Sequence, residues 1–346
     1  MKILVTGGLG MVGRPLVQRL LRNGHTVKVI DRIPEADADR TALNGAAYAC
    51  CDINDFSALR QQVRGMEAIV HLAALPHPAA ASGPEVFRIN CAGSFNVYEA
   101  AAQEGIRRVV SASSINALGF NYGIKSFPIR YLPVDEEHPS FTTDPYSFSK
   151  QVLEDIGAYY GRREGISGVQ LRLPAVLHIT EEFRLMVRQF APITRQAFDK
   201  VLSMSAANQQ QRARQLIAEV DAGRARRDRE KPWNGEMPEG EWKLDLNDPL
   251  PLISFGYTDF WAVIHEEDSA QALEKGLMAD YTGSHPLFVA DSVNMLNVEA
   301  EMLARIFYPE ATRTRPLVGS EPLVSFDKAR QLIGYEPEHS SSEWLE

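Results

Sequence analysis

A glycine-rich loop near the start of the chain sets the strongest limit on its fold. The apolar run Lys2–Thr6 predicts a strand, and residues 13–23 have the residue spacing of a helix. The turn between them reads Thr6-Gly7-Gly8-Leu9-Gly10-Met11-Val12-Gly13. Glycines here permit a tight turn, close approach of the backbone to a pyrophosphate, and close packing of helix on strand. The N-terminus of the helix adds free N–H groups and a favourable dipole for phosphates.

The loop therefore predicts a dinucleotide site. The residues expected to contact the cofactor are Gly7, Gly10, Met11, Val12 and Gly13. A glycine-rich turn without a ligand is the alternative, and the strand-turn-helix context argues against it.

Asp31 strengthens this prediction because it closes the second predicted strand, residues 25–30. A carboxylate at that position accepts hydrogen bonds from the ribose hydroxyls of adenosine. Its charge repels a 2′-phosphate and so favours NAD over NADP, although the guanidinium of Arg32 can hold such a phosphate. A solvated strand end is the alternative for Asp31. We predict NAD as the cofactor, with Asp31 and Arg32 in its site.

The first half of the chain alternates short apolar runs with helical stretches. Further strands are predicted at residues 46–51, 68–72, 109–112 and 168–173. Helices are predicted at residues 84–104 and 144–164. This alternation is typical of an α/β fold with a Rossmann-type, doubly wound parallel sheet.

The pattern changes in the second half. Residues 181–229 are rich in Gln, Arg and Ala with helical periodicity, and residues 233–248 are irregular. A strand at 286–289 and a helix at 297–307 follow. We predict an NAD-binding Rossmann domain over residues 1–180. Residues 181–346 are expected to form a smaller substrate-binding lobe, with some segments returning to the Rossmann core.

Composition excludes several classes of function. The 45 acidic and 36 basic residues leave a net charge of −9, which argues against nucleic-acid binding. No apolar run has the roughly 18–20 residues that a membrane span needs, and no secretory signal is recognisable. The three cysteines lack metal-ligand spacing, so we expect reduced thiols and no metal site. A cytoplasmic protein without nucleic-acid or membrane partners is predicted.

Further motifs follow in an order that identifies a family. Cys51-Asp52-Ile53 ends the third predicted strand, and His71-Leu72-Ala73-Ala74 ends the fourth. Asn90 follows on a helix, then Ser111-Ala112-Ser113-Ser114 with Gly119, and then Tyr146-Ser147-Phe148-Ser149-Lys150. In this combination the chain resembles the extended short-chain dehydrogenase/reductase family of NAD-dependent sugar epimerases, dehydratases and dehydrogenases. The resemblance covers residues 1–180 well and about the last eighty more loosely.

The resemblance implies more cofactor contacts. Asp52 would meet the adenine amino group, and Ile53 would pack against the ring. The residues that it further places near the cofactor are Leu72, Ala73, Ala74, Asn90, Ser113, Tyr146, Lys150, Pro174 and Val176.

It also implies a catalytic set of Ser114, Tyr146 and Lys150, with Ser113 as the alternative serine. Tyr146 and Lys150 are four residues apart and share one face of a helix. A free tyrosine has a pKa of about 10, and a neighbouring ammonium and the positive nicotinamide favour its phenolate. Tyr146 can then accept a proton from a substrate hydroxyl while hydride leaves the same carbon. An incidental surface pair is the alternative, and the combination of motifs disfavours it.

The substrate side departs from the family pattern. Arg172 matches the family's sixth strand, but the usual asparagine and the Tyr-Gly-Pro loop after it are missing. Leu118 replaces the usual tyrosine, and His265 occupies what is often an aspartate. These departures put a standard nucleotide-sugar pocket in doubt. The residues predicted to touch substrate are His77, Ser114, Asn116 and His178.

An arginine-rich stretch, residues 209–229, has two interpretations. Its arginines could form a cationic lid over an acidic or phosphorylated substrate. Acidic residues alternate with them, so a solvated helix is the favoured interpretation.

We therefore expect an enzyme that oxidises a secondary alcohol of a carbohydrate or nucleotide sugar by hydride transfer to NAD. A dehydrogenase would release the ketone, whereas an epimerase would return the hydride to its other face. A non-catalytic NAD-binding regulatory protein on the same fold is the alternative, and it would be expected to lose the Tyr146 and Lys150 pair. The helices near residues 86–102 and 152–160 match the family's dimer-forming pair, which predicts a homodimer.

Overall fold

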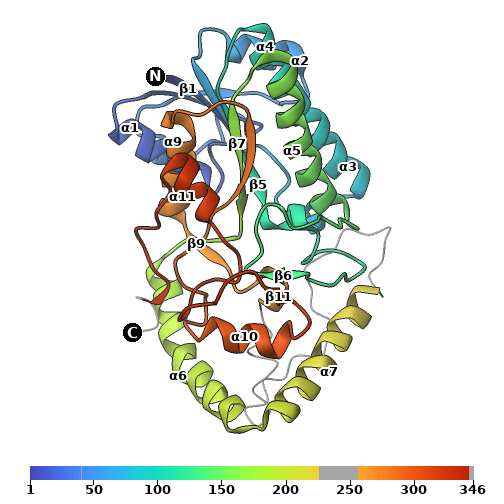
Figure 1. Cartoon of the computed structure of the whole chain (residues 1–346). Helices are drawn as coiled ribbons and strands as arrows, with labels where there is room; N and C mark the ends of the chain where they lie inside the picture. Colours follow the sequence, from blue (N-terminus) through green and yellow to red (C-terminus); the bar gives the residue numbers. More distant parts are fainter. Residues whose placement is uncertain (40, 226–255, 343–346) are drawn as a thin grey trace.

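The central element of the computed structural model is a sheet of seven parallel strands (Figure 1). The structure describes residues 1–39, 41–225 and 256–342. The strand order is β10-β7-β5-β4-β1-β2-β3, with every neighbouring pair parallel. The strands are β1 (Lys2–Thr6), β2 (Thr26–Asp31), β3 (Ala47–Cys50), β4 (Ala68–His71), β5 (Val109–Ser114), β7 (Gly168–Leu173) and β10 (Ser284–Phe288). The predicted Rossmann-type sheet is confirmed.

Helices cover both faces of the sheet. One face carries α1 (Gly13–Arg22), α9 (Glu266–Met278) and α11 (Asp327–Ile333). The other carries α2 (Phe56–Val63), α3 (Gly83–Phe87), α4 (Gly93–Gln103) and α5 (Pro145–Glu164). Figure 1 shows these two groups on opposite sides of the strands.

Alternation along β1 explains the two layers. Ile3 and Val5 belong to the same buried cluster as Leu16 and Leu20 of α1. Leu4, between them, belongs to the opposite cluster, which contains residues of α2, α4 and α5. Side chains of a strand point alternately to its two faces, so a continuous apolar run is needed when helices cover both.

The order of the strands reverses beside β1. The chain goes from β1 to β2 and β3 on one side, and then returns to β4 on the other. Ligands of open α/β sheets bind outside the carboxyl ends of the strands at such a reversal. The glycine loop leaves the carboxyl end of β1 at this point.

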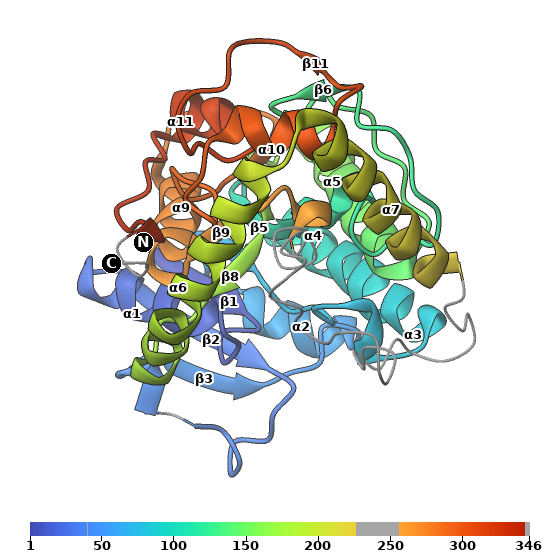
Figure 2. The ribbon, with the colours of Figure 1, turned by 90° about the horizontal axis from the view of Figure 1, so that it is seen from below.

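The second half of the chain builds a lobe beyond the carboxyl ends of the strands (Figure 2). It contains α6 (Glu181–Ser203), α7 (Ala206–Ala225) and α10 (Ala300–Phe307). Two small parallel sheets pair β8 (Ala175–Leu177) with β9 (Val263–His265), and β6 (Tyr131–Leu132) with β11 (Thr312–Arg313).

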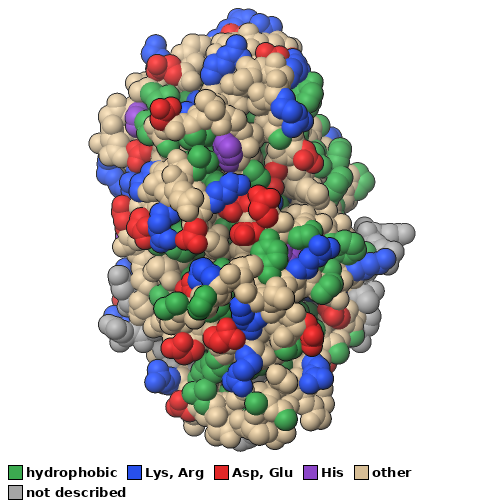
Figure 3. Space-filling view, viewed as in Figure 1, with side chains coloured by type: hydrophobic (Ala, Val, Ile, Leu, Met, Phe, Trp, Pro, Cys, Tyr) green, Lys and Arg blue, Asp and Glu red, His purple; other side chains and the backbone are tan. Residues whose placement is uncertain are grey.

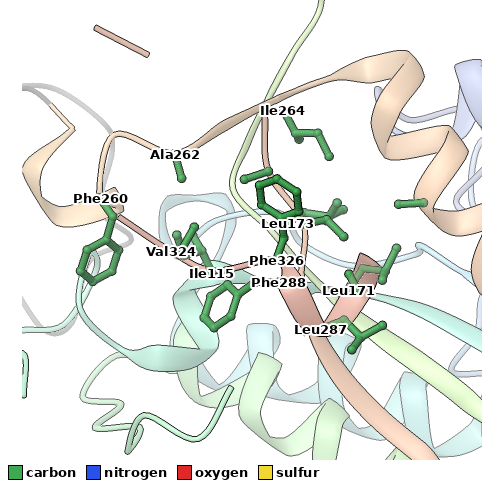
Figure 4. Packing of buried hydrophobic residues seen from close by; sticks show 14 of the residues in the cluster. Ile115, Leu171, Leu173, Phe260, Ala262, Ile264, Leu287, Phe288, Val324 and Phe326 are labelled. Atoms are coloured by element: carbon green, nitrogen blue, oxygen red, sulfur yellow. The ribbon is translucent and has the colours of Figure 1, made fainter. Parts of the chain in front are cut away.

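Segments of the second half also complete the main sheet. The strand β10 pairs with β7 along its length, and α9 packs on α1. Leu171 and Leu173 of β7 lie in one apolar cluster with Leu287 and Phe288 of β10 and with Ile264 (Figure 4). This cluster links the sheet to the lobe.

Three predicted elements differ from the structure. The helix predicted at 84–104 is three consecutive pieces, because a π-helical turn, Arg88–Ala92, separates α3 from α4. The strand predicted at 109–112 continues to Ser114, since Ser113 and Ser114 pair with β7. The helix predicted at 297–307 begins only at Ala300.

Two predicted segments lie outside the described residues, namely the irregular segment 233–248 and the end of the predicted helical stretch, 226–229. Among the residues that are described, no helix combines the length and the apolar character that crossing a bilayer requires.

Candidate active site

A cavity of about 700 Å³ opens at the carboxyl ends of β1, β4 and β5. It brings the three predicted catalytic residues, Ser114, Tyr146 and Lys150, to one place. It is also lined by nearly all the residues predicted to hold the cofactor, namely Gly7, Gly10, Met11, Val12, Gly13, Asp31, Arg32, Asp52, Ile53, Leu72, Ala73, Ala74, Ser113, Pro174 and Val176. Its volume lies within the range of small-molecule sites.

The backbone of the glycine loop requires glycine at Gly7. This residue has a φ of +71°, and a Cβ there would lie 2.7 Å from the backbone nitrogen of Ala73. A Cβ on Gly13 would lie 2.6 Å from the Cα of Gly8, so the loop closes on itself. No side chain caps the N-terminus of α1, and the backbone N–H groups of Gly13 and Arg14 both donate to the carbonyl of Gly10 at 3.1 Å. What α1 offers a phosphate is therefore mainly the positive end of its dipole.

Two aspartates also line the cavity, Asp31 at the end of β2 and Asp52 just after β3. Asp31 ends β2, and its Oδ1 accepts a hydrogen bond of 2.8 Å from the backbone N–H of Arg32. The Oδ1 of Asp52 accepts from the backbone N–H of Asn54, also at 2.8 Å. Both carboxylates are therefore held at the rim by local backbone contacts, where an adenosine moiety would reach them.

The start of α5 positions Tyr146 and Lys150. Asp144 caps this helix by accepting a hydrogen bond of 2.9 Å from the backbone N–H of Ser147, and Pro145 occupies its first position. These are typical helix-start residues, so the position of the candidate catalytic pair at the start of α5 follows from local sequence. The Nζ of Lys150 lies 5.7 Å from the centre of the Tyr146 ring and donates to the carbonyl of Ala112 at 2.8 Å.

The geometry separates the two candidate serines. Ser113 lines the cavity, but its hydroxyl donates to Oε1 of the buried Glu154 at 2.8 Å. Ser114 instead accepts hydrogen bonds from the backbone N–H and the Nδ2 of Asn116, at 3.1 and 3.2 Å. Its hydroxyl also stabilises the phenolate of Tyr146. The hydroxyl of Ser113 is thus committed to a buried carboxylate, which favours Ser114 as the candidate catalytic serine.

Burial dominates the electrostatics of the catalytic pair. It lowers the pKa of Lys150 to about 8, against smaller opposing effects of Cys91 and Glu154. It raises the pKa of Tyr146 above the usual value of tyrosine, a shift that the hydroxyl of Ser114 opposes. The prediction that the pKa of Tyr146 is lowered therefore does not hold for the protein alone, because desolvation penalises the phenolate more than the hydroxyl of Ser114 stabilises it.

A buried ion pair supports the wall beneath the serines. The guanidinium of Arg172 on β7 donates to both carboxylate oxygens of Glu154 on α5, at 2.9 and 2.8 Å. With the hydroxyl of Ser113, this pair ties β5, β7 and α5 together. Removing either charged partner would leave the other buried and uncompensated, a large cost.

Three predicted site residues do not line the cavity. Asn90 lies beneath it, where its side chain accepts from the backbone N–H of Leu75 and donates to the Leu75 carbonyl, at 2.8 and 3.1 Å. It therefore anchors the cavity-lining loop after β4. His77 is exposed in that loop, and His178 is an exposed partner of Glu266, with 2.5 Å between Nδ1 and Oε2. The histidines were predicted from nearness in sequence to the cleft, which says little about side-chain direction.

Among the cavity residues that were missed, four have a charged group, an amide or a hydroxyl: Arg88, Asn121, Tyr122 and Asp259. Arg88 lies in the π-helical turn, two residues before Asn90. Asn121 and Tyr122 closely follow the family glycine, Gly119, so the sequence carried a signal for them. The ring of Tyr122 meets that of Tyr146 edge-on, with centroids 5.7 Å apart. Asp259 follows no motif.

One cavity on a Rossmann fold thus contains a glycine loop of the dinucleotide-binding type, an aspartate at the end of β2 and a Ser-Tyr-Lys set. This combination is typical of a nucleotide-dependent oxidoreductase. The sequence profile of the NAD dependent epimerase/dehydratase family matches residues 3–228. The chain belongs to this family, and its cofactor is NAD.

Individual relatives share the first part of the chain. Uronate dehydrogenase of Pseudomonas putida is 29% identical over 54% of this chain and 65% of its own length. L-arabinose 1-dehydrogenase (NAD(P)+) of Haloferax volcanii is 33% identical over 52% of this chain and 69% of its own length. The matched region thus covers only about two thirds of these relatives.

The fold similarity extends over the whole chain. UDP-glucose 4-epimerase of Thermotoga maritima, solved with UDP-glucose, has a TM-score of 0.62 and 18% identity. The superposition covers 100% of this chain and 96% of the epimerase. At this identity the similarity shows a shared fold and nothing more.

Proposed function

We propose that the protein oxidises a secondary alcohol of a carbohydrate or nucleotide sugar, as a dehydrogenase or as an epimerase. The observation that carries this proposal is the convergence of Ser114, Tyr146 and Lys150 on the cavity that the glycine loop enters. The relatives that act on sugars support it. A purely regulatory NAD-binding protein would have no use for this buried set.

The residues of the cavity fit the cofactor. Gly7 lets the loop pack closely against the backbone of Ala73, and the loop residues Gly10 to Gly13 line the cavity at the positive end of the α1 dipole. Asp31 would bind the adenosine ribose, Asp52 and Ile53 the adenine, and Lys150 the nicotinamide ribose. NAD⁺, when bound, supplies the hydride acceptor and a positive charge beside the catalytic pair.

The chain itself handles the proton. Ser114 donates a hydrogen bond to the substrate oxygen, and Tyr146 as phenolate accepts the proton of that hydroxyl. The carbon–hydrogen bond breaks with its electron pair leaving as hydride, so the alcohol becomes a ketone and one proton stays on Tyr146. Lys150 holds positive charge against the phenolate, which lowers the cost of forming it.

This function is tested by incubating the protein with NAD⁺ and a panel of aldoses, uronic acids and UDP-sugars. A dehydrogenase produces NADH, measured by absorbance, and an epimerase interconverts sugars without net NADH. Binding of NAD⁺ without either outcome on the whole panel would contradict the proposal.

We also propose a homodimer formed through α4 and α5. Two stacked aromatic pairs lie exposed on this side, Phe87 with Phe148 and Phe95 with Tyr159, at centroid distances of 6.2 and 6.3 Å. Each of these rings is 40–47% exposed. Hydrophobic side chains follow the edge formed by these helices in Figure 3. Clustered exposed aromatic residues mark protein interfaces.

The dimer predicts a solution mass of twice the 38.5 kDa of the chain, measured by light scattering. Phe95→Asp should shift that mass to the monomer, because it places a charge in the apolar contact. Val318→Asp is the matched control, since Val318 is 71% exposed in a loop away from these helices. A monomeric wild-type protein would refute the interface.

A cytoplasmic location is part of the proposal. The three cysteines are free, and Cys51 and Cys91 are buried. Free thiols suit a reducing compartment.

A further inference from the structure

A strained turn presents Asp259 to the cavity. The turn begins at Gly256, continues as the 3-10 helix Tyr257–Asp259, and ends with Phe260 and Trp261. These last two residues have φ values of +58° and +50°, in the left-handed region that bulky side chains rarely adopt. Such strain persists only where the surrounding structure enforces it, and it gathers at functional sites.

Aromatic packing enforces this turn. Phe260 and Trp261 are fully buried. The ring of Phe260 stacks on Phe120 at 5.4 Å, and that of Trp261 meets Phe307 edge-on at 5.1 Å. In addition, the Thr258 hydroxyl donates to Oδ1 of Asn121, another cavity residue, at 2.7 Å. The core thus fixes the direction of Asp259.

The carboxylate of Asp259 faces the catalytic end of the cavity. It lines the same space as Ser114 and Tyr146, and its negative charge raises the pKa of Tyr146. Its Oδ1 is covered and has no hydrogen-bond partner among the described residues. Asp259 as a whole is only partly buried and lines the cavity, so its carboxylate keeps surface that the hydrogen-bond donors of a ligand can reach.

The positive charge of Arg224 on α7 lowers the pKa of this carboxylate. Its side chain is only 2% exposed, so the sequence-based interpretation of a solvated helix is wrong for this arginine. The guanidinium lies 5.7 Å from the ring of Phe120, and Nη1 lies 3.7 Å from Oδ1 of Asp221. Burial raises the pKa of Asp259 to about 7, and the charge of Arg224 opposes the shift.

We propose that Asp259 binds the hydroxyl groups of a neutral sugar ring and excludes a ring that carries a carboxylate. This inference rests on the proposed function and names the substrate class of the same site. A carboxylate is an acceptor only, so it pairs with sugar hydroxyls, which donate. A carboxylate on the substrate would bring a second negative charge close to that of Asp259 in the cavity, which disfavours binding.

The ring can belong to a free sugar or to a nucleotide sugar, and matched substrate pairs distinguish the two. Galactose with galacturonate, and UDP-glucose with UDP-glucuronate, differ only in the oxidation of one carbon. At about pH 8 we expect the wild type to prefer the neutral member by at least about tenfold in kcat/KM. In Asp259→Asn the preference should fall to about threefold or less, whereas Asp259→Glu should retain it.

Titration provides a second readout. Asp259 should be mostly protonated near pH 6 and mostly ionised near pH 8, given its pKa of about 7. The neutral-to-acidic preference should therefore increase with pH more steeply in the wild type than in Asp259→Asn. The other charged or titratable groups facing Asp259 in the described structure are Arg224, Tyr146 and Tyr308. Their titration would act on the acidic member of each pair in wild type and in Asp259→Asn alike, so the difference between the two proteins isolates the contribution of Asp259.

Binding separates this inference from the proposed function. Calorimetric titration of each sugar into the protein with NADH measures the same preference without turnover. A preference present in binding but without catalysis would contradict the function alone. Equal preference in wild type and Asp259→Asn, or no binding of any neutral sugar, would overturn the role of Asp259. Asp327→Asn, on the distant α11, is the control, and melting temperature with NAD⁺ affinity verifies that each variant folds.

Discussion

Replacing Tyr146 by phenylalanine should lower kcat by about 10²–10⁴-fold, because the proton acceptor is removed while its ring remains. The ring is buried and contacts Tyr122, so phenylalanine fills the same volume. NAD⁺ affinity and melting temperature should stay close to the wild-type values. Stopped-flow measurement of NADH formation with saturating substrate provides kcat, and fluorescence titration provides the affinity.

Ser113→Ala and Ser114→Ala form the matched comparison for this result. Ser114→Ala should reduce kcat, whereas Ser113→Ala should mainly reduce stability, because its hydroxyl contacts Glu154 rather than the cavity. Retention of full activity in Tyr146→Phe would show that another group accepts the proton.

Replacing Lys150 by methionine should abolish turnover yet stabilise the protein without cofactor. Burial lowers the pKa of Lys150 from 10.5 to about 8, so the fold disfavours its charged form. Below pH 8 this penalty is about 3 kcal/mol at 1.36 kcal/mol per pKa unit. Loss of the hydrogen bond to the Ala112 carbonyl costs about 1 kcal/mol. Urea unfolding at pH 7 should therefore show a net gain of about 2 kcal/mol.

The pH dependence of this gain tests its cause. A base with a lowered folded-state pKa destabilises the fold fully below about pH 8, and the penalty disappears as pH rises toward 10.5. The difference in unfolding free energy between Lys150→Met and wild type should decrease over that interval. Lys2→Met, an exposed position at the far end of β1, should show no such change. A gain independent of pH would indicate packing rather than desolvation.

Sequence reasoning succeeded where local rules suffice. The glycine loop lies between one strand and one helix, and Gly7 is required by its own φ. Tyr146 and Lys150 lie one turn apart on a helix whose capping residues are also local. The strand order could be expected because parallel strands connected by helices form a doubly wound sheet.

The sequence did not reveal which residues of the second half of the chain face the cavity, because long-range packing determines their positions. Asp259 faces the cavity only because Phe260 and Trp261 are buried against rings such as Phe120 and Phe307. Arg224 is buried although its neighbours in sequence alternate acid and base, since the helix that carries it packs toward Phe120. His178 illustrates the reverse error, because its side chain points to Glu266 on the surface.

The pairing of β10 with β7 has a consequence for synthesis of the chain. During translation, residues 168–173 leave the ribosome more than one hundred residues before their neighbour at 284–288. Until then the edge of β7 remains unpaired, and α1 lacks the cover of α9. Exposed strand edges invite aggregation, so the nascent chain should depend on chaperones during this interval. Nonsense mutations or ribosome stalling before residue 284 should therefore yield insoluble fragments even though the glycine loop and the catalytic pair are already made.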